Sequence, residues 1–150
     1  MFFGEYERTV DAKGRLTIPA HLAAARAEAD WSKVVIVKGE GPCLFLFDTH
    51  TWQTVLGTAF NAFDDEDARL FMHRNLPDAQ LSELDALNRV TIPTALLAHA
   101  GIEKRVTLIG LFNRVELWDP EAWKSYVESR QDVDVPSIAE VSRASIREVS

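Results

Sequence analysis

The stretch that decides the fold is Asp11-Ala-Lys-Gly-Arg15-Leu-Thr-Ile-Pro19, because it occurs twice. Its second copy reads Asp85-Ala-Leu-Asn-Arg89-Val-Thr-Ile-Pro93, at a constant offset of 74 residues. Identical Asp, Ala, Arg, Thr, Ile and Pro at matched positions are hard to ascribe to chance, and an internal repeat sets the architecture of a whole chain. The sequence therefore predicts a duplicated fold.

The repeat continues through a second block. It matches residues 34–37 to residues 106–109, and residues 44–52 to residues 115–123. In the last of these blocks the offset between the copies has fallen to 71 residues. Each copy reads as turn, strand, short helix, two strands and second helix. Because a unit of this size is marginal alone, we expect the copies to share one core. The expected division is a first repeat at 1–62, a helical linker at 63–79, a second repeat at 80–127 and a C-terminal tail at 128–150.

The repeated stretch begins with turn chemistry. Asp11 suits the first position of a type I turn and Gly14 the left-handed position that follows, which predicts a three-residue hairpin loop with a bulge. Lys13 then lies at the tip and Arg15 on the returning strand. In the second copy Asp85 starts the turn and Asn88 replaces the glycine; Asn is the next most tolerant residue of positive φ. Alternating residues on either side predict half-buried strands.

Helix signals follow each strand pair. Pro19 and Pro93 end strands and suit helix starts, which predicts helices at 20–29 and 94–100, the latter stopped by Gly101. Asp48 and Asp119 are expected caps of second helices, the first of them at 49–58. Residues 64–72 read as a further helix and residues 76–78 as a turn. The tail beyond about residue 130 is either a docking helix or partly disordered. For the matched Trp52 and Trp123, packing is favoured over a stacking role.

Composition indicates one compact cytoplasmic unit. The chain has 150 residues, of which 47% are hydrophobic, enough for one ordinary core. It has neither the roughly 20-residue apolar segment of a membrane helix nor a secretory signal at its start. Cys43 is the single cysteine, so an internal disulfide is impossible, and we expect it to be a small buried hydrophobe.

The charge distribution bears on nucleic-acid binding. The net charge of −7 argues against it, because phosphate binding needs local positive potential. Many carboxylates, however, fall in residues 64–67 and in the tail, whereas the segment 8–15 carries Arg8, Lys13 and Arg15 against Asp11 alone. The global charge therefore weakens a DNA hypothesis without excluding it.

The doubled Asp-x-x-x-Arg motif followed by Thr-Ile-Pro resembles the AbrB/SpoVT superfamily of swapped-hairpin DNA-binding domains. Two copies in one chain, with residues 2–6 reading Phe-Phe-Gly-Glu-Tyr and residues 117–123 reading Leu-Trp-Asp-Pro-Glu-Ala-Trp, resemble the MraZ family over residues 1–127. The resemblance implies a mixed β/α fold: a pseudo-twofold, AbrB-like double-hairpin β-barrel with short peripheral helices. It also implies ring-shaped homo-oligomers and a transcriptional repressor, nucleoid-associated, that binds promoter direct repeats of the division and cell-wall gene cluster, including its own gene.

The expected DNA-binding residues centre on the first turn. Arg15 would bind a phosphate or read guanine through its guanidinium. Lys13 and Arg8 would add phosphate contacts that set position rather than sequence. Neutral hydrogen bonds would come from Thr9 and Thr17. For Arg89 the functional and structural readings are about even, because Leu87 suits a phosphate surface poorly. For Asp11 and Asp85 a purely turn-fixing role is favoured, since carboxylates repel phosphate.

The sequence also bears on two other classes of protein. An enzyme is disfavoured because the four histidines are scattered, no Gly-rich phosphate loop occurs, and neither a metal site, a cofactor nor a small-molecule substrate is indicated. The alternative is an oligomeric protein-interaction or antitoxin-like module that uses the same barrel. Salt distinguishes the two, because DNA binding weakens steeply with salt and an apolar protein interface does not.

Overall fold

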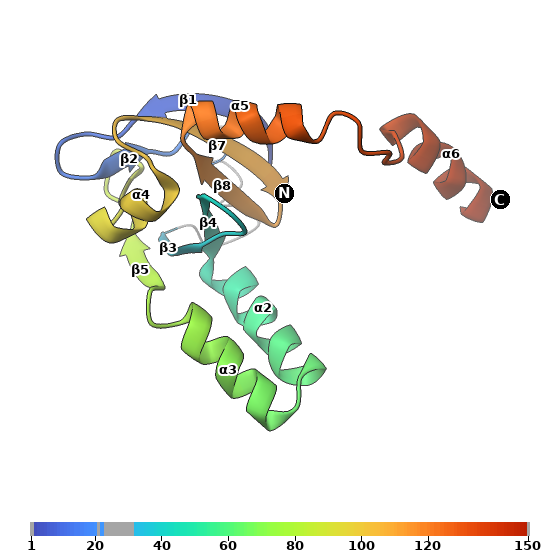
Figure 1. Cartoon of the computed structure of the whole chain (residues 1–150), viewed down its shortest axis with the longest axis horizontal. Coiled ribbons are helices and arrows are strands. Elements are labelled where there is room, and N and C mark those ends of the chain that lie inside the picture. Colours follow the sequence, from blue (N-terminus) through green and yellow to red (C-terminus); the bar gives the residue numbers. More distant parts are fainter. Residues whose placement is uncertain (1, 21, 23–31, 150) are drawn as a thin grey trace.

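The computed structural model describes residues 2–20, 22 and 32–149, with side chains through residue 146. It is a mixed α/β fold with antiparallel sheets and short helices, which confirms the predicted class (Figure 1). The strands are β1 (Phe2–Thr9), β2 (Arg15–Thr17), β3 (Lys33–Lys38), β4 (Cys43–Asp48), β5 (Gln80–Glu83), β6 (Arg89–Thr91), β7 (Arg105–Phe112) and β8 (Arg114–Trp118). The helices are α2 (Thr49–Ala62), α3 (Asp65–Asn75), α4 (Thr94–Ala100), α5 (Pro120–Ser129) and α6 (Ile138–Val149).

Strand pairing interleaves the two copies. Six strands form one sheet in the order β1-β7-β8-β4-β3-β5, and β2 pairs with β6 in a separate two-stranded ribbon. Strand β1 of the first copy pairs with β7 of the second, and β5 of the second pairs with β3 of the first. The pairs β2–β6 and β4–β8 each join equivalent strands. Exchanging the copies therefore maps the whole pairing pattern onto itself.

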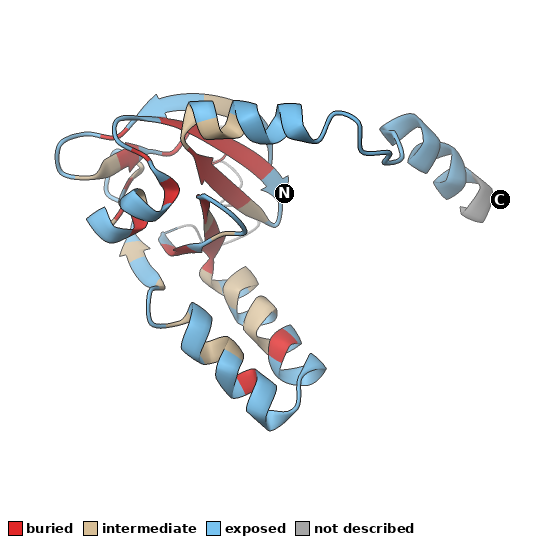
Figure 2. Cartoon of the chain, viewed as in Figure 1, coloured by how far each residue is buried: buried red, intermediate tan, exposed pale blue. Residues whose placement is uncertain are grey.

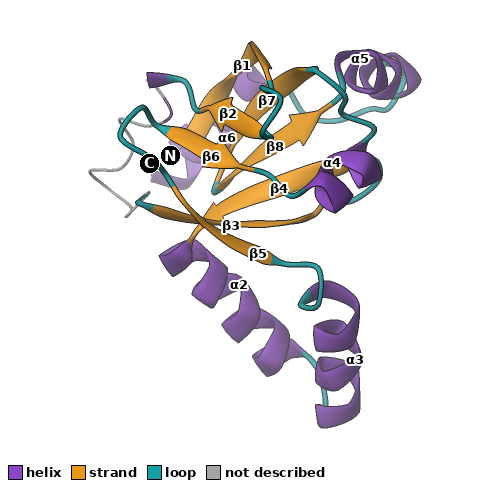
Figure 3. Ribbon diagram, turned by 90° about the vertical axis from the view of Figure 1, so that its left-hand side faces the viewer, coloured by secondary structure: helices purple, strands orange, loops and turns teal. Residues whose placement is uncertain are grey.

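The expected closed barrel is wrong for the described strands. The six-stranded sheet has two edges, β1 and β5, because neither strand continues its ladder onto the β2–β6 ribbon. Figure 3 shows the ribbon lying between the two ends of the curved sheet. The reason is local: β2 and β6 have only three residues each, and the prolines at 19 and 93, which lack a backbone N–H, follow soon after.

One apolar core fills the inside of the curved sheet. It joins the inward side chains of both copies, including Leu16 of β2 and Val90 of β6, which are fully buried. Outside the sheet, α2 packs on a cluster around Phe47 and α5 on a cluster around Trp118. The ribbon and the helices α2 and α5 therefore lie on opposite faces of the sheet.

Most of the helix predictions are confirmed. Helix α4 has the predicted bounds, and Gly101 ends it in the left-handed region with φ of 65°. The caps are also as expected, since Asp48 accepts from the backbone N–H of Thr51 and Asp119 from that of Ala122. Helix α2 runs four residues further than expected, to Ala62. The helix expected at 20–29 lies almost wholly outside the described residues.

The other segments refine the sequence analysis. Helix α3 forms a hairpin with α2, and the tail contains a helix, α6, which lies clear of the sheet (Figure 1). Trp52 and Trp123 are half-buried in the two outer clusters, as the packing interpretation requires, with rings 5.6 Å from Phe47 and 5.5 Å from Trp118. Within the described residues, every helix is too short or too polar to cross a membrane.

Candidate nucleic-acid interface

The ribbon brings the two repeated motifs together. Its register pairs Arg15 with Thr91 and Thr17 with Arg89, around the central pair Leu16–Val90. Because successive side chains of a strand alternate between faces, the two arginines and two threonines share one face. The opposite face carries the buried pair, so the polar face points away from the core. We call Arg15, Thr17, Arg89 and Thr91 the ribbon face.

The first turn holds its arginine in one orientation. Asp11 Oδ1 accepts from the backbone N–H of Lys13 and from that of Arg15, both at 2.9 Å, and Oδ2 accepts from Arg15 Nε at 2.6 Å. The Arg15 backbone N–H, and then its guanidinium, hold the pKa of the Asp11 carboxyl below its ordinary value of 3.8. The bound carboxylate therefore stays charged and orients the guanidinium.

The second turn repeats this arrangement. Asp85 Oδ1 accepts from the backbone N–H groups of Leu87 and Arg89, and Oδ2 accepts from Arg89 Nε at 2.7 Å. The same donors lower the pKa of Asp85. Within the described part of the chain, the Nη atoms of Arg15 and Arg89 have no partner, so both guanidinium ends remain able to donate. Both aspartates act as turn formers and as orienting groups.

Each turn is also tied to the other copy. The carbonyl of Gly14 accepts from Ile92 N–H at 2.8 Å, and that of Asn88 accepts from Ile18 N–H at 2.9 Å. Both residues are left-handed, with φ of 77° at Gly14 and 58° at Asn88. The position of one arginine is thereby linked to that of the other through backbone hydrogen bonds.

The other residues expected to bind DNA, Lys13, Arg8 and Thr9, lie on the first turn and on the two sides of β1. Lys13 is exposed at the tip of the first turn, next to the ribbon. Arg8 lies on the inner side of β1, where its guanidinium is 5.7 Å from the centre of the Tyr6 ring and donates to Glu7 O at 2.7 Å. Thr9, the next residue, points to the outer face. The structure thus brings Lys13, Arg15, Thr17 and Arg89 together but separates Thr9 from them.

One member of the ribbon face was missed from the sequence. Thr91 is exposed and pairs directly with Arg15. The offset of 74 residues relates it to Thr17, so the repeat itself contained the signal.

The two turns differ at their tips. The offset relates Lys13 of the first turn to Leu87 of the second, and the Leu87 side chain is 65% exposed. One end of the ribbon is therefore cationic and the other apolar, although the two ion pairs are alike.

The described residues give little support for a reactive thiol or a metal site. Cys43 is buried, as predicted, and burial raises the pKa of its thiol to about 12. Among the residues that the structure describes, no group of three His, Cys, Asp or Glu side chains is arranged to hold a metal ion.

A duplicated chain whose copies exchange strands, and whose two equivalent arginines meet on an exposed ribbon, defines a class: internally repeated, β-rich proteins with a pseudo-twofold cationic face. The comparisons with known proteins are more specific. The family model for "MraZ protein, putative antitoxin-like" matches residues 1–74 and again residues 76–145. The chain belongs to the MraZ family.

Curated relatives agree with the family model. The transcriptional regulator MraZ of Acetivibrio thermocellus is 37% identical, covering 93% of this chain and 95% of the relative. That of Caldanaerobacter subterraneus is 39% identical with the same coverage, and that of Cytophaga hutchinsonii 34% identical over 84% of each chain. Among solved structures, PHS018 from Pyrococcus horikoshii has a TM-score of 0.30 at 17% identity, covering 78% of this chain and 88% of its own, too weak a likeness for any argument. The family is one of transcriptional regulators.

Proposed function

We propose that the chain regulates transcription by binding double-stranded DNA through the ribbon face. The observation that supports this is the ribbon register, which sets two oriented arginines and two threonine hydroxyls on the exposed side of a two-stranded ribbon. A ribbon of this kind fits the major groove of B-DNA, where arginine is the commonest reader of guanine.

Each side chain then has a distinct role. Because Asp11 and Asp85 occupy the Nε atoms, Arg15 and Arg89 present their Nη groups to a base edge or a phosphate. Lys13 binds a phosphate beside the first turn and fixes position rather than sequence. Leu87 adds no phosphate contact at the other end, so the first copy contributes more affinity than the second.

Self-association is the second part of the proposal. One chain offers few cations against a net charge of −7. A ring-shaped homo-oligomer would present the ribbon face several times to successive promoter repeats and raise affinity through effective concentration. We assign the repeats to the promoter of the division and cell-wall gene cluster, including the chain's own gene, and the protein to the nucleoid. The functional units are the copies at 1–62 and 80–127, joined by 63–79.

The test is fluorescence-anisotropy binding to DNA from directly upstream of the chain's own gene, at two salt concentrations. Arg15→Ala is compared with Arg69→Ala, which removes an exposed arginine of α3, outside the ribbon face. We expect tight, salt-sensitive binding that Arg15→Ala weakens at least tenfold and Arg69→Ala leaves within twofold. Equal binding of upstream and random duplex by the wild type would defeat the operator assignment.

The second candidate function is a protein-interaction module of the antitoxin-like kind, which agrees with the words "putative antitoxin-like" in the description of the family. Binding through Z phosphates gives a log–log salt slope near −0.9Z, whereas an apolar protein interface gives a slope near zero.

A further inference from the structure

Helix α6 is amphipathic and lies clear of the other described elements (Figure 1). It is capped by Ser137, whose Oγ accepts from Glu140 N–H at 3.1 Å, and every described side chain of it is exposed (Figure 2). Its larger apolar residues, Ile138, Val141 and Ile146, are 87%, 57% and 69% exposed. At this spacing they share one side of the helix. An isolated helix of 12 residues is marginal in water, so α6 needs a partner.

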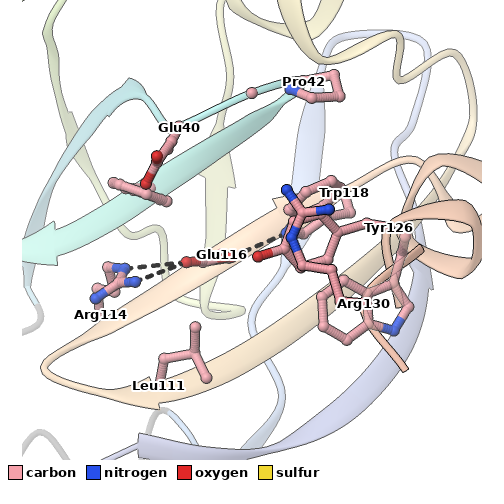
Figure 4. A pocket seen from close by; sticks show the side chains of 11 residues that line it. Glu40, Pro42, Leu111, Arg114, Glu116, Trp118, Tyr126 and Arg130 are labelled. Atoms are coloured by element: carbon pink, nitrogen blue, oxygen red, sulfur yellow. Dashed lines mark hydrogen bonds and ion pairs between the residues drawn. The ribbon is translucent and has the colours of Figure 1, made fainter. Parts of the chain in front are cut away.

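The outer face of the sheet contains a largely apolar cleft, which we call the aromatic cleft. It has a volume of about 560 Å³ and lies between β4 with the turn that precedes it, the β7–β8 hairpin and α5 (Figure 4). No residue of α5 is fully buried, although the helix covers the sheet here. The rim is charged on both sides, with Glu40 opposite Arg130 in the view of Figure 4. The apolar lining comes mainly from Phe45, Leu111, Trp118, Trp123 and Tyr126.

The interior of the cleft is fully organised before anything binds. Glu116 is buried, and its carboxylate accepts from Trp118 Nε1 at 3.0 Å and from Arg114 Nη2 at 2.9 Å. Arg114 in turn stacks on Phe45, with its guanidinium carbon 4.6 Å from the ring centre. The polar groups of the floor are thus satisfied by one another, and the free surface offered to an occupant is aromatic and aliphatic.

The first copy shows how such a surface is completed. There α3 follows α2 and packs along it, burying Ala68 and setting Phe71 5.9 Å from Phe63. In the second copy α6 follows α5 in the same order, and the family model spans both helix pairs. Yet α6 does not lie along α5 (Figure 1). In the second copy, therefore, the apolar side of α6 and the aromatic cleft are both exposed.

We propose that α6 of one chain docks, through Ile138, Val141 and Ile146, into the aromatic cleft of a second copy. The loop between α5 and α6 carries α6 away from its own cleft (Figure 1), which favours a neighbour as acceptor. Glu140 and Arg143 lie away from the apolar side of α6, so docking through that side buries neither charge.

This inference rests on the self-association proposed above and specifies its geometry. The apolar side of α6 and the aromatic cleft are different surfaces, so the contact between two chains is head-to-tail. Successive contacts of this kind close into a ring or extend as a filament. The cleft lies on the outer face of the sheet with α5, whereas the ribbon face lies on the other side. Docking therefore leaves Arg15 and Arg89 accessible to DNA.

The test is cross-linking between two separately purified full-length variants, Val141→Cys and Leu111→Cys, with a short bismaleimide and without DNA. The buried native thiol of Cys43 does not compete, because its pKa is about 12. We expect a covalent dimer from the mixture, at several times the yield of either variant alone. The matched control replaces Val141→Cys by Arg143→Cys, on the opposite side of α6, and should give several-fold less product.

The other outcomes overturn the inference in different ways. If only a double variant, Val141→Cys with Leu111→Cys, cross-links, and does so within one chain, α6 closes on its own cleft. If neither experiment gives product, α6 does not use the cleft at all. Light scattering of the wild type separates these failures from that of self-association: a mass above 16.8 kDa without cross-linking rejects the α6 contact and leaves the oligomer standing.

Discussion

Replacement of Gly14 by alanine tests whether the first turn is held as the structure describes. Gly14 has φ of 77°, and a Cβ added there would lie 2.8 Å from the carbonyl oxygen of Ile92. That carbonyl belongs to the residue whose N–H donates to Gly14 O, so the contact cannot relax without disturbing the bond between the copies. The substitution therefore carries both a conformational and a packing cost.

The magnitude follows from these two costs. A residue with a Cβ pays about 1–2 kcal/mol for the left-handed conformation. Weakening the Ile92–Gly14 hydrogen bond adds about 0.5–1.5 kcal/mol. We expect Gly14→Ala to lower the free energy of unfolding by roughly 2–3 kcal/mol, which at this chain length lowers Tm by roughly 5–10 °C.

Urea denaturation followed by circular dichroism, at one fixed protein concentration, measures the change. The matched control is Asn88→Gly, because Asn88 occupies the equivalent left-handed position with φ of 58° and already has a Cβ. Glycine there relieves strain, so the control should be neutral within about 1 kcal/mol. A Gly14→Ala variant within about 0.5 kcal/mol of wild type would refute the described turn and the link between the arginines.

Three further results are expected. Leu87→Lys gives the second turn the cation that Lys13 gives the first, and should tighten DNA binding while making the salt slope steeper by about one phosphate contact, measured by anisotropy. The pKa values of Asp11 and Asp85 are lower in the folded chain than their ordinary value of 3.8. Their carboxylates therefore stabilise the folded chain at pH values above 3.8, and this stabilisation is lost as the pH falls through the folded pKa values. A variant with both aspartates replaced by Asn should show a flatter loss of stability below about pH 4 in acid titrations. Cys43 should resist iodoacetamide at pH 8 in the folded chain and react once urea unfolds it, as read by intact mass, and rapid labelling of the folded form would contradict its burial.

Local signals in the sequence predicted local structure well. The caps at Asp48 and Asp119 and the stop at Gly101 are short-range features in which a side chain or a glycine satisfies neighbouring backbone groups. Their physics lies within a few residues, so the sequence contains it. The same holds for the paired turns, where the Asp-to-Arg spacing of four residues allows one carboxylate to reach both backbone and guanidinium.

Pairing between distant strands was harder to predict. Alternation at residues 5–10 and 15–18 predicted two strands next to one turn, but it carries no information on their partners. The structure pairs these strands with β7 and β6 of the other copy rather than with each other. The prediction of a closed barrel was wrong for this reason. Alternation along β1, in contrast, separates the side chains of Arg8 and Thr9 whatever the strand pairs with, so the sequence already contained that difference.

The pairing of β1 with β7 also sets an order of events during synthesis. Phe2 lies opposite Phe112, which is translated 110 residues later. Strand β1 must therefore wait for β7 before its hydrogen bonds form, and contacts so distant in sequence slow folding. Until β7 has been made, the inward apolar side of β1 lacks its pairing strand, so the growing chain exposes apolar surface of the kind that favours aggregation.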